Sequence, residues 1–207
     1  MAFIDAHQPQ PARHMQNRSV SRSGAGPRGR KEAMLVGVPR EIKVHEYRTG
    51  LTPASVRELT WRGHSVMVET SLGAAIGLGD EQYAAAGARI LPAARDIWDR
   101  AELIVKVKEP QAAERALLRE GQVLFTYLHL AADPQQAAEL LQSRAVCIAY
   151  ETVTAPGGGL PLLAPMSEVA GRLAVQAGAA HLELPAGGMG VLLSGVPGVP
   201  PAHVVII

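Results

Sequence analysis

The 207-residue sequence predicts an α/β fold, a Rossmann-like parallel sheet flanked by helices. From Met34 onward, short apolar stretches alternate with helix-forming ones, the pattern of parallel strands joined by right-handed helical crossovers. Hydrophobic residues make up 47% of the chain but aromatic residues only 4%, so the core must consist of aliphatic strands and alanine-rich helices. Two capping residues directly followed by proline, Thr52-Pro53 and Asp133-Pro134, mark helix starts.

The expected elements follow in chain order. Strands are expected over residues 34–38, 64–69, 89–91, 103–107, 123–128 and 145–150. Helices are expected from Thr52-Pro53 to before Gly63, over 80–86 with Asp80 as the cap, over 93–100, from Pro110, and over 134–143. Ile97 and Trp98 should turn inward. Residues 71–79 and 152–161 are rich in glycine or proline and should be loops.

Further along, residues 167–183 predict a long alanine-rich helix, opened by Pro165-Met166-Ser167-Glu168. Free N–H groups at that helix start favour an anion such as a cofactor phosphate, although Ser167 could equally cap its own helix. Residues 185–201 read as a Gly/Pro-rich loop and 203–207 as a last apolar strand. Gly-rich residues 187–190 and 195–198 lack the G-x-G-x-x-G spacing of a nucleotide loop, so we interpret them as flexible connectors.

Residues 1–33 carry six basic and two acidic residues and show neither a helical nor a strand period, so we expect a disordered basic extension. A transit peptide is an alternative, and Met34 is a candidate for the true start. The mildly acidic remainder gives no basis for nucleic-acid binding, and no apolar run is long enough to span a membrane. The single cysteine, Cys147, lies in an apolar run and suggests inert packing in a reducing cytoplasm.

Three strand-to-helix junctions carry candidate functional residues. Arg48 follows the first strand, Lys108 follows strand 103–107, and His129 follows strand 123–128. In a parallel sheet all three junctions lie at one edge, where ligands bind in open α/β folds. An arginine fork for a carboxylate, a lysine charge and a histidine that exchanges protons suit a small carboxylic acid.

Each of these residues also has an ordinary structural explanation. Arg48 could make only surface ion pairs with neighbouring glutamates, which contribute little. Lys108 could be solvated charge, and Lys106 on the same strand face is a competing candidate. His129 could be a core histidine. The histidines at 45, 64, 181 and 203 show no metal-ligand spacing with one another or with Cys147, so no metal site is expected.

Five stretches together resemble bacterial alanine dehydrogenase. They are GVPREIKVHEYR (37–48), KVKEP (106–110), FTYLHLAA (125–132), AYETV (149–153) and LPLLAPMSEVAGR (160–172). The resemblance runs from residue 34 to residue 207 almost without a gap. The related α subunit of proton-translocating transhydrogenase shares the opening GVPRE pattern but usually lacks the TYLHLAA and PMSEVAGR stretches.

The resemblance implies an oxidoreductase that converts L-alanine, NAD and water to pyruvate, ammonium and NADH. It implies a substrate pocket with Arg48 and Lys108 on the substrate carboxylate and carbonyl, His129 as the catalytic acid or base, Tyr127 and Glu151 lining or supporting the pocket, and Met166 and Ser167 facing the NAD cofactor. It further implies a small-molecule substrate, a homo-hexamer and a cytoplasmic location, with neither a nucleic-acid nor a membrane partner.

The resemblance also implies a domain division. Residues 34–165 would form the substrate (N-terminal) domain, and residues 166–207 a connecting helix, a Gly/Pro loop and the first strand of an NAD domain. Met189 stands where the family usually has arginine in G-G-R-G. We expect a C-terminally truncated chain with most of the NAD site missing and no dehydrogenase activity by itself. The alternatives are a transhydrogenase-like subunit and a non-catalytic module that binds 2-oxo acids.

Overall fold

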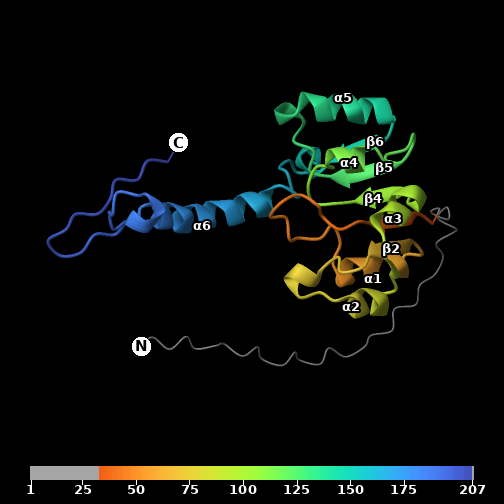
Figure 1. Ribbon diagram of the computed structural model, residues 1–207, viewed down its shortest axis with the longest axis horizontal. Coiled ribbons are helices and arrows are strands. Elements are labelled where there is room, and N and C mark those ends of the chain that lie inside the picture. Colours follow the sequence, from red (N-terminus) through yellow and green to blue (C-terminus); the bar gives the residue numbers. More distant parts are fainter. Residues whose placement is uncertain (1–32, 207) are drawn as a thin grey trace. The chain divides into compact units, whose positions relative to one another are not determined.

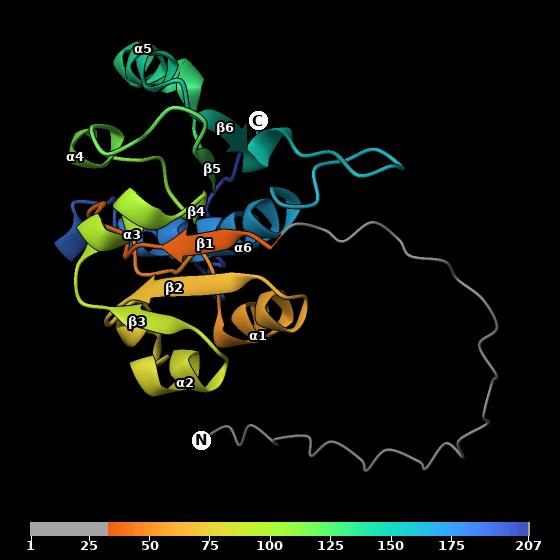
Figure 2. The ribbon, with the colours of Figure 1, turned by 90° about the vertical axis from the view of Figure 1, so that its right-hand side faces the viewer.

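The computed structural model describes residues 33–206; the disordered extension expected for residues 1–33 lies almost wholly outside them. Within the described part, six strands form one sheet with the order β3-β2-β1-β4-β5-β6, and every neighbouring pair is parallel. Figure 1 shows the sheet among its helices, and Figure 2 labels the strands in this order. The strands are β1 (Leu35–Val38), β2 (Ser65–Glu69), β3 (Arg89–Leu91), β4 (Leu103–Val105), β5 (Val123–Thr126) and β6 (Val146–Ala149). The expected α/β parallel fold is thereby confirmed.

Six α-helices connect or follow these strands in the described residues. They are α1 (Pro53–Trp61), α2 (Asp80–Ala85), α3 (Ala94–Arg100), α4 (Ala112–Arg115), α5 (Pro134–Ser143) and α6 (Ala164–His181). Single 3-10 turns lie at Ala74–Ile76, Leu130–Ala132, Tyr150–Thr152 and Leu184–Ala186. Helix α3 and helix α1 lie on opposite sides of the sheet (Figure 2), as in a doubly wound fold.

The two Pro-marked helix starts are confirmed. Thr52 caps α1 by accepting a hydrogen bond from the N–H of Ser55 at 3.3 Å, and Asp133 caps α5 through the N–H of Gln136 at 3.0 Å. The expectation for Asp80 is wrong, because Gly79 is the capping position of α2. The Asp80 carboxylate instead accepts hydrogen bonds from the hydroxyl of Thr70 and the N–H of Ser71, which brace the turn before the helix.

Two elements near the carboxyl end of β4 are shorter than expected. Strand β4 ends at Val105 rather than at residue 107, because the Glu41 carboxylate takes the N–H of Val107 at 2.6 Å. Helix α4 begins at Ala112 rather than at Pro110, since Gln111 caps it and donates its backbone N–H to the Glu114 side chain. In both cases a glutamate carboxylate accepts a backbone N–H at the point where the element ends or begins.

The C-terminal elements also differ from expectation. Helix α6 begins at Ala164, three residues early, so Ser167 lies inside its first turn and does not cap it. The N–H of Ser167 is already bonded to the carbonyl of Leu163 at 3.1 Å. Residues 203–206 do not form the expected strand, because no strand pairs with them in the described part, and Ile206 is 93% exposed.

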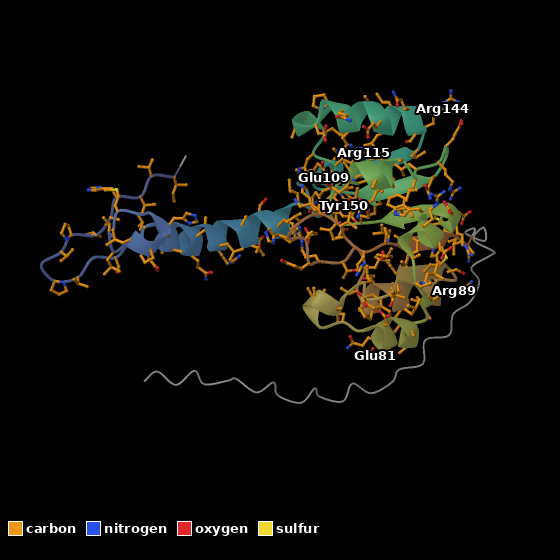
Figure 3. All side chains as sticks on the ribbon, in the orientation of Figure 1. Glu81, Arg89, Glu109, Arg115, Arg144 and Tyr150 are labelled. Carbon is orange, nitrogen blue, oxygen red and sulfur yellow. The ribbon has the colours of Figure 1, made fainter. Side chains whose placement is uncertain are left out.

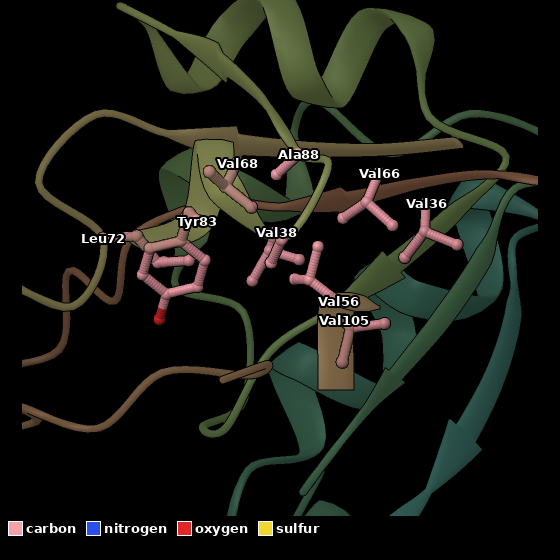
Figure 4. Close-up of a cluster of buried hydrophobic side chains, with 10 residues drawn as sticks. Val36, Val38, Val56, Val66, Val68, Leu72, Tyr83, Ala88 and Val105 are labelled. Carbon is pink, nitrogen blue, oxygen red and sulfur yellow. The ribbon is translucent and has the colours of Figure 1, made fainter. Parts of the chain in front are cut away.

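Two apolar clusters fix the helices to the sheet. On one face, Val56 of α1 and Tyr83 of α2 are fully buried against valines of β1 and β2 (Figure 4). On the other face, Ile97 and Trp98 of α3 are fully buried with Leu124 of β5, which confirms their inward orientation. Burying a side chain of this size stabilises the fold by roughly 1.5–3 kcal/mol. The strand ends that carry the candidate residues therefore rest on a packed base.

The approach of α3 to β1 requires glycine at position 37. A β-carbon placed on Gly37 would lie 2.5 Å from Ile97 and 2.6 Å from Ala101. We expect Gly37→Ala to lower the free energy of unfolding by about 1–3 kcal/mol, because the core must shift to admit a methyl group. Gly157→Ala, where a β-carbon meets nothing within 4 Å, is the matched control. Urea unfolding measures both, and equal stability of the two variants would contradict this packing account.

Candidate functional site

The sheet order creates a crevice between β1 and β4. The chain winds outward in both directions from this pair, so the loops that leave β1 and β4 diverge at their carboxyl ends. In Figure 3, Glu109 and Tyr150 mark this edge of the sheet, and Arg89 and Arg144 mark the opposite edge. A cavity of about 600 Å³ opens beside the crevice. Another of about 680 Å³ lies at the opposite edge, which is not where open α/β sheets bind ligands.

The loop after β1, residues 39–52, is fastened to the end of β4. One carboxylate oxygen of Glu41 accepts the N–H of Val107, and the other lies 3.0 Å from Nζ of Lys106. Farther along the loop, a β-carbon on Gly50 would lie 2.6 Å from the carbonyl oxygen of Val105, so only glycine allows this approach. The loop is thus held against residues 105–107, at the end of β4, from two positions.

Lys106, the competing candidate, is fully buried. Its ammonium also contacts Glu114 at 2.8 Å, so it lies between two carboxylates whose side chains are at most 6% exposed. Burial raises the pKa of Glu114, and the charge of Lys106 opposes that rise. Because it pairs with both carboxylates, Lys106 fastens Glu41 and α4 to the sheet. A second ion pair, between Lys43 of the loop and Glu109, adds another fastening point.

Arg48 lies in the middle of the fastened loop. Its Nε and Nη2 atoms donate to the two carboxylate oxygens of Glu46 at 2.7 and 2.5 Å, a bidentate pair. Nη1 contacts Sδ of Met166 in the first turn of α6 at 3.2 Å. The hydrogen bonds from Arg48 outweigh partial burial and hold the pKa of Glu46 below its ordinary value. Glu46 therefore occupies one edge of the guanidinium and leaves the Nη1 end beside the cavity.

The cavity itself is largely apolar. Arg48, Lys106, Tyr127, Tyr150 and Met166 are among its lining residues. The hydroxyl of Tyr127 donates to the carbonyl oxygen of Leu162 at 2.5 Å. Burial raises the pKa of Tyr127 and of Tyr150, so both phenols stay protonated at neutral pH. A guanidinium whose Nη1 end remains beside an apolar cavity suits a small molecule with one carboxylate and a short carbon chain.

His129 lies beside this cavity rather than in its wall. Its ring stacks on Tyr127 with centroids 5.8 Å apart and an interplanar angle of 11°. The ring is exposed, and together with Glu151 it lines a neighbouring recess of about 430 Å³. Both oxygens of Glu151 face backbone N–H groups of Leu128 and His129. Tyr127 thus contacts the histidine through its ring and lines the same cavity as Arg48.

The remaining candidates lie around the same edge. Lys108 is half-buried, and its charge contributes to lowering the pKa of Glu46 and of Glu109. Met166 contacts Arg48, while Ser167 is exposed one position farther along α6. The structure thus brings Arg48, Tyr127 and Met166 to one cavity, with His129 and Glu151 next to it and Lys108 beside Glu46.

Sequence reasoning missed the residues that support the site. Nothing in the spacing of Glu41, Lys106 and Glu114 indicates that they meet. The sequence predicts no more for Glu46 than a surface ion pair with Arg48. Cys147, expected in the core, is half-buried, and burial raises the pKa of its thiol. Among residues 33–206, no group of three or more His, Cys, Asp or Glu side chains could hold a metal ion. None of the helices in that range is long and apolar enough to cross a membrane.

The Glu46–Arg48 pair makes stability depend on pH in a defined direction. Because the pKa of Glu46 in the fold lies below its ordinary 4.5, the pair stabilises the protein fully above that value and stops doing so as the pH falls through the folded pKa. We expect Glu46→Gln to lower the free energy of unfolding at pH 7 by up to about 1 kcal/mol, with the deficit shrinking below pH 4.5.

Urea unfolding of both proteins between pH 3 and pH 7 measures that deficit. Glu58→Gln, which breaks the exposed pair with Arg62 on α1, is the control and should have a smaller effect at every pH. A Glu46→Gln deficit that stays constant down to pH 3 would contradict the account.

Comparison with known proteins matches the chain to two family models. Residues 37–170 match the alanine dehydrogenase/PNT N-terminal domain, and residues 174–207 match the corresponding C-terminal domain. The alanine dehydrogenase of Halomonas elongata is 60% identical over 174 residues, which are 84% of this chain and 47% of that protein. Over the same length, that of Bacillus subtilis is 53% identical, with 46% of it covered. The chain spans about half the length of these curated relatives.

Solved structures give the same grouping. An L-alanine dehydrogenase structure superposes with a TM-score of 0.73 at 53% identity, covering 82% of this chain and 46% of that one. A transhydrogenase from Sinorhizobium meliloti superposes less closely, with a TM-score of 0.53 at 26% identity over 56% of this chain and 35% of that one. The fold, the matched length and the identity agree, and the chain belongs to the alanine dehydrogenase/PNT N-terminal domain family.

Proposed function

We propose that this chain carries the substrate-binding half of an alanine dehydrogenase-type oxidoreductase. The overall reaction would convert L-alanine, NAD and water to pyruvate, ammonium and NADH. The observation that carries the proposal is the Arg48 guanidinium at the crevice between β1 and β4: Glu46 holds one edge, and the Nη1 end lies beside a cavity of about 600 Å³. A carboxylate on a two- or three-carbon chain fits that arrangement.

The proposed roles follow from what each side chain can donate. Arg48 binds the substrate carboxylate through its cavity-facing end, and Lys108 adds positive charge toward the carbonyl oxygen. His129 exchanges the proton at the reacting carbon's oxygen or nitrogen, because an imidazole changes charge near neutral pH. Tyr127 stacks on His129 and shares the cavity wall with Arg48, so it links the two parts of the proposed site. Glu151 supports the pocket from behind His129.

The nicotinamide of NAD would accept the hydride when bound, and we propose Met166 and Ser167 as its contacts. Met166 touches Arg48, and the exposed Ser167 follows it, so a ring resting on the first turn of α6 would lie beside the substrate. Among the described residues we propose contacts for the nicotinamide end of the cofactor only. Since the relatives are about twice as long, we propose that the other half of the fold supplies the rest of the NAD site.

Three further expectations belong to the same proposal. The partner is a small molecule, either the amino acid or its 2-oxo acid. The assembly is a homo-hexamer, and the location is the cytoplasm.

A transhydrogenase-like subunit is the second candidate, because the chain resembles the Sinorhizobium meliloti protein. The alanine dehydrogenase type is favoured, since the identity is 53% to the L-alanine dehydrogenase structure and 26% to the transhydrogenase. A non-catalytic 2-oxo-acid-binding module is the third candidate.

Calorimetric titration of the purified chain with pyruvate tests the proposal. We expect saturable binding that Arg48→Ala weakens at least about tenfold, since a hydrogen-bonded charge on a ligand carboxylate contributes roughly 1.5–3 kcal/mol. Arg57→Ala is the matched control, because Arg57 is exposed on α1, and it should leave the affinity unchanged.

A repeat of the titration with NADH separates the candidates. Binding of equal strength with and without NADH agrees with a substrate half whose cofactor site is incomplete, and pyruvate binding that requires NADH would contradict that reading. A folded chain that does not bind pyruvate at all, or binds it equally well as Arg48→Ala, would overturn the proposed substrate site.

A further inference from the structure

The backbone at His129 has a conformation that ordinary residues disfavour. Its φ of 49° and ψ of 40° lie in the left-handed region, which glycine enters freely and a residue with a β-carbon does not. His129 follows the end of β5 by three residues and directly precedes the 3-10 turn Leu130–Ala132. A disfavoured conformation at such a position persists only when the surrounding structure holds it.

The Glu151 carboxylate supplies part of that hold. One oxygen accepts the N–H of His129 at 2.7 Å and the N–H of Leu128 at 3.1 Å, and the second oxygen lies 3.3 Å from the N–H of Leu128. Partial burial raises the pKa of Glu151, but the backbone hydrogen bonds, first that of His129, lower it by more. The carboxylate therefore stays ionised at neutral pH and binds both N–H groups as a charged acceptor.

Gln136 holds the same turn from the other side. Its Nε2 donates to the carbonyl oxygen of Leu128 at 2.5 Å, and its side chain is almost fully buried. Its own N–H is fixed by the Asp133 cap at the start of α5. The peptide groups on both sides of Leu128 are consequently bonded. The N–H of Leu128 is bonded to Glu151 in the 3-10 turn after β6, and its C=O is bonded to Gln136 in α5.

We propose that Glu151 and Gln136 are positioning residues that hold His129 in its left-handed conformation, with its ring stacked on Tyr127 beside the Arg48 cavity. This role of His129 rests on the proposed function. The geometry separates Glu151 from the substrate: its oxygens already accept backbone N–H groups, and a second carboxylate would be repelled by it. The sequence resemblance implies that Glu151 lines or supports the pocket. It does not imply that Glu151 or Gln136 holds the backbone of His129.

Amide NMR of the ¹⁵N-labelled chain tests the hold directly. Charged acceptors form roughly twice as strong hydrogen bonds as neutral ones. In Glu151→Gln we therefore expect the Leu128 and His129 amide protons to shift upfield and to exchange about tenfold faster, while the amides of β1 and β4 keep their exchange rates. Glu168→Gln, on the exposed surface of α6, is the matched control and should change neither amide.

Gln136→Leu provides the second variant, because it keeps the side-chain size and removes only the donor to Leu128. Faster exchange at Leu128 and His129 is again the expected result. Unchanged amides in both variants would overturn the proposal. Faster exchange throughout the sheet would overturn it as well, because the two residues would then serve only overall stability.

Pyruvate titration of Glu151→Gln links the hold to the site. We expect a smaller loss of affinity than Arg48→Ala causes, about two- to fivefold, because the carboxylate contact remains while the carbonyl contact loosens. Affinity equal to that of the unaltered chain would overturn the link to the substrate. If the unaltered chain does not bind pyruvate, the proposed function fails, and the amide results alone then decide whether Glu151 and Gln136 hold the turn.

Discussion

The candidate site depends on one buried ion-pair group, Lys106 between Glu41 and Glu114. Taking these charges out of water is costly, and the cost is offset only because each carboxylate also accepts a backbone N–H. Removing one partner of such a pair typically destabilises a fold by about 3–5 kcal/mol, since the remaining charge is uncompensated. The group therefore acts as a fixed point. It joins the loop after β1 to the end of β4 at the place where the sheet order opens a crevice.

The two tasks that we propose for the site, carboxylate binding and proton exchange, belong to side chains on different elements. Arg48 lies on the loop that Glu41 and Gly50 fasten to β4, so its position depends on β4 rather than on a ligand. His129 lies on a different element, the turn after β5. Tyr127 touches the histidine through its ring and lies beside the arginine in the cavity wall. The carboxylate anchor and the proton-exchanging group that we propose lie on separate, independently braced elements, and such preorganisation would lower the entropic cost of binding.

Much of the fold was predictable from local signals. Alternation of apolar strands and helices indicated the parallel sheet, and the Thr52-Pro53 and Asp133-Pro134 pairs located two helix starts correctly. Two of the errors arise from side-chain contacts with other segments of the chain. Glu41 took the N–H of Val107 from strand β4, and the Asp80 carboxylate bonded to residues 70–71 instead of capping α2. Periodicity and capping rules read neighbours along the chain, so they do not register such contacts.

The candidate residues divide in the same way. The position of Arg48, Lys108 and His129 after successive parallel strands was enough to place them at one edge. The roles of Lys106 and Glu151 were not predictable, because each depends on which partner it meets in space. The sequence made Lys106 an alternative to Lys108 as the functional lysine. In the structure Lys106 is enclosed by two carboxylates. For Glu151 the resemblance implied that it lines or supports the pocket, without indicating that its oxygens accept the N–H groups of residues 128 and 129.

The most direct test of the account is a crystal structure of the chain with pyruvate bound. The account predicts a pyruvate carboxylate within hydrogen-bond distance of Nη1 of Arg48, with Glu46 still paired to Nε and Nη2 and the carbonyl group directed toward His129. Pyruvate bound at another edge of the sheet, or an Arg48 that turns away from the ligand while Lys106 makes the contact, would contradict it.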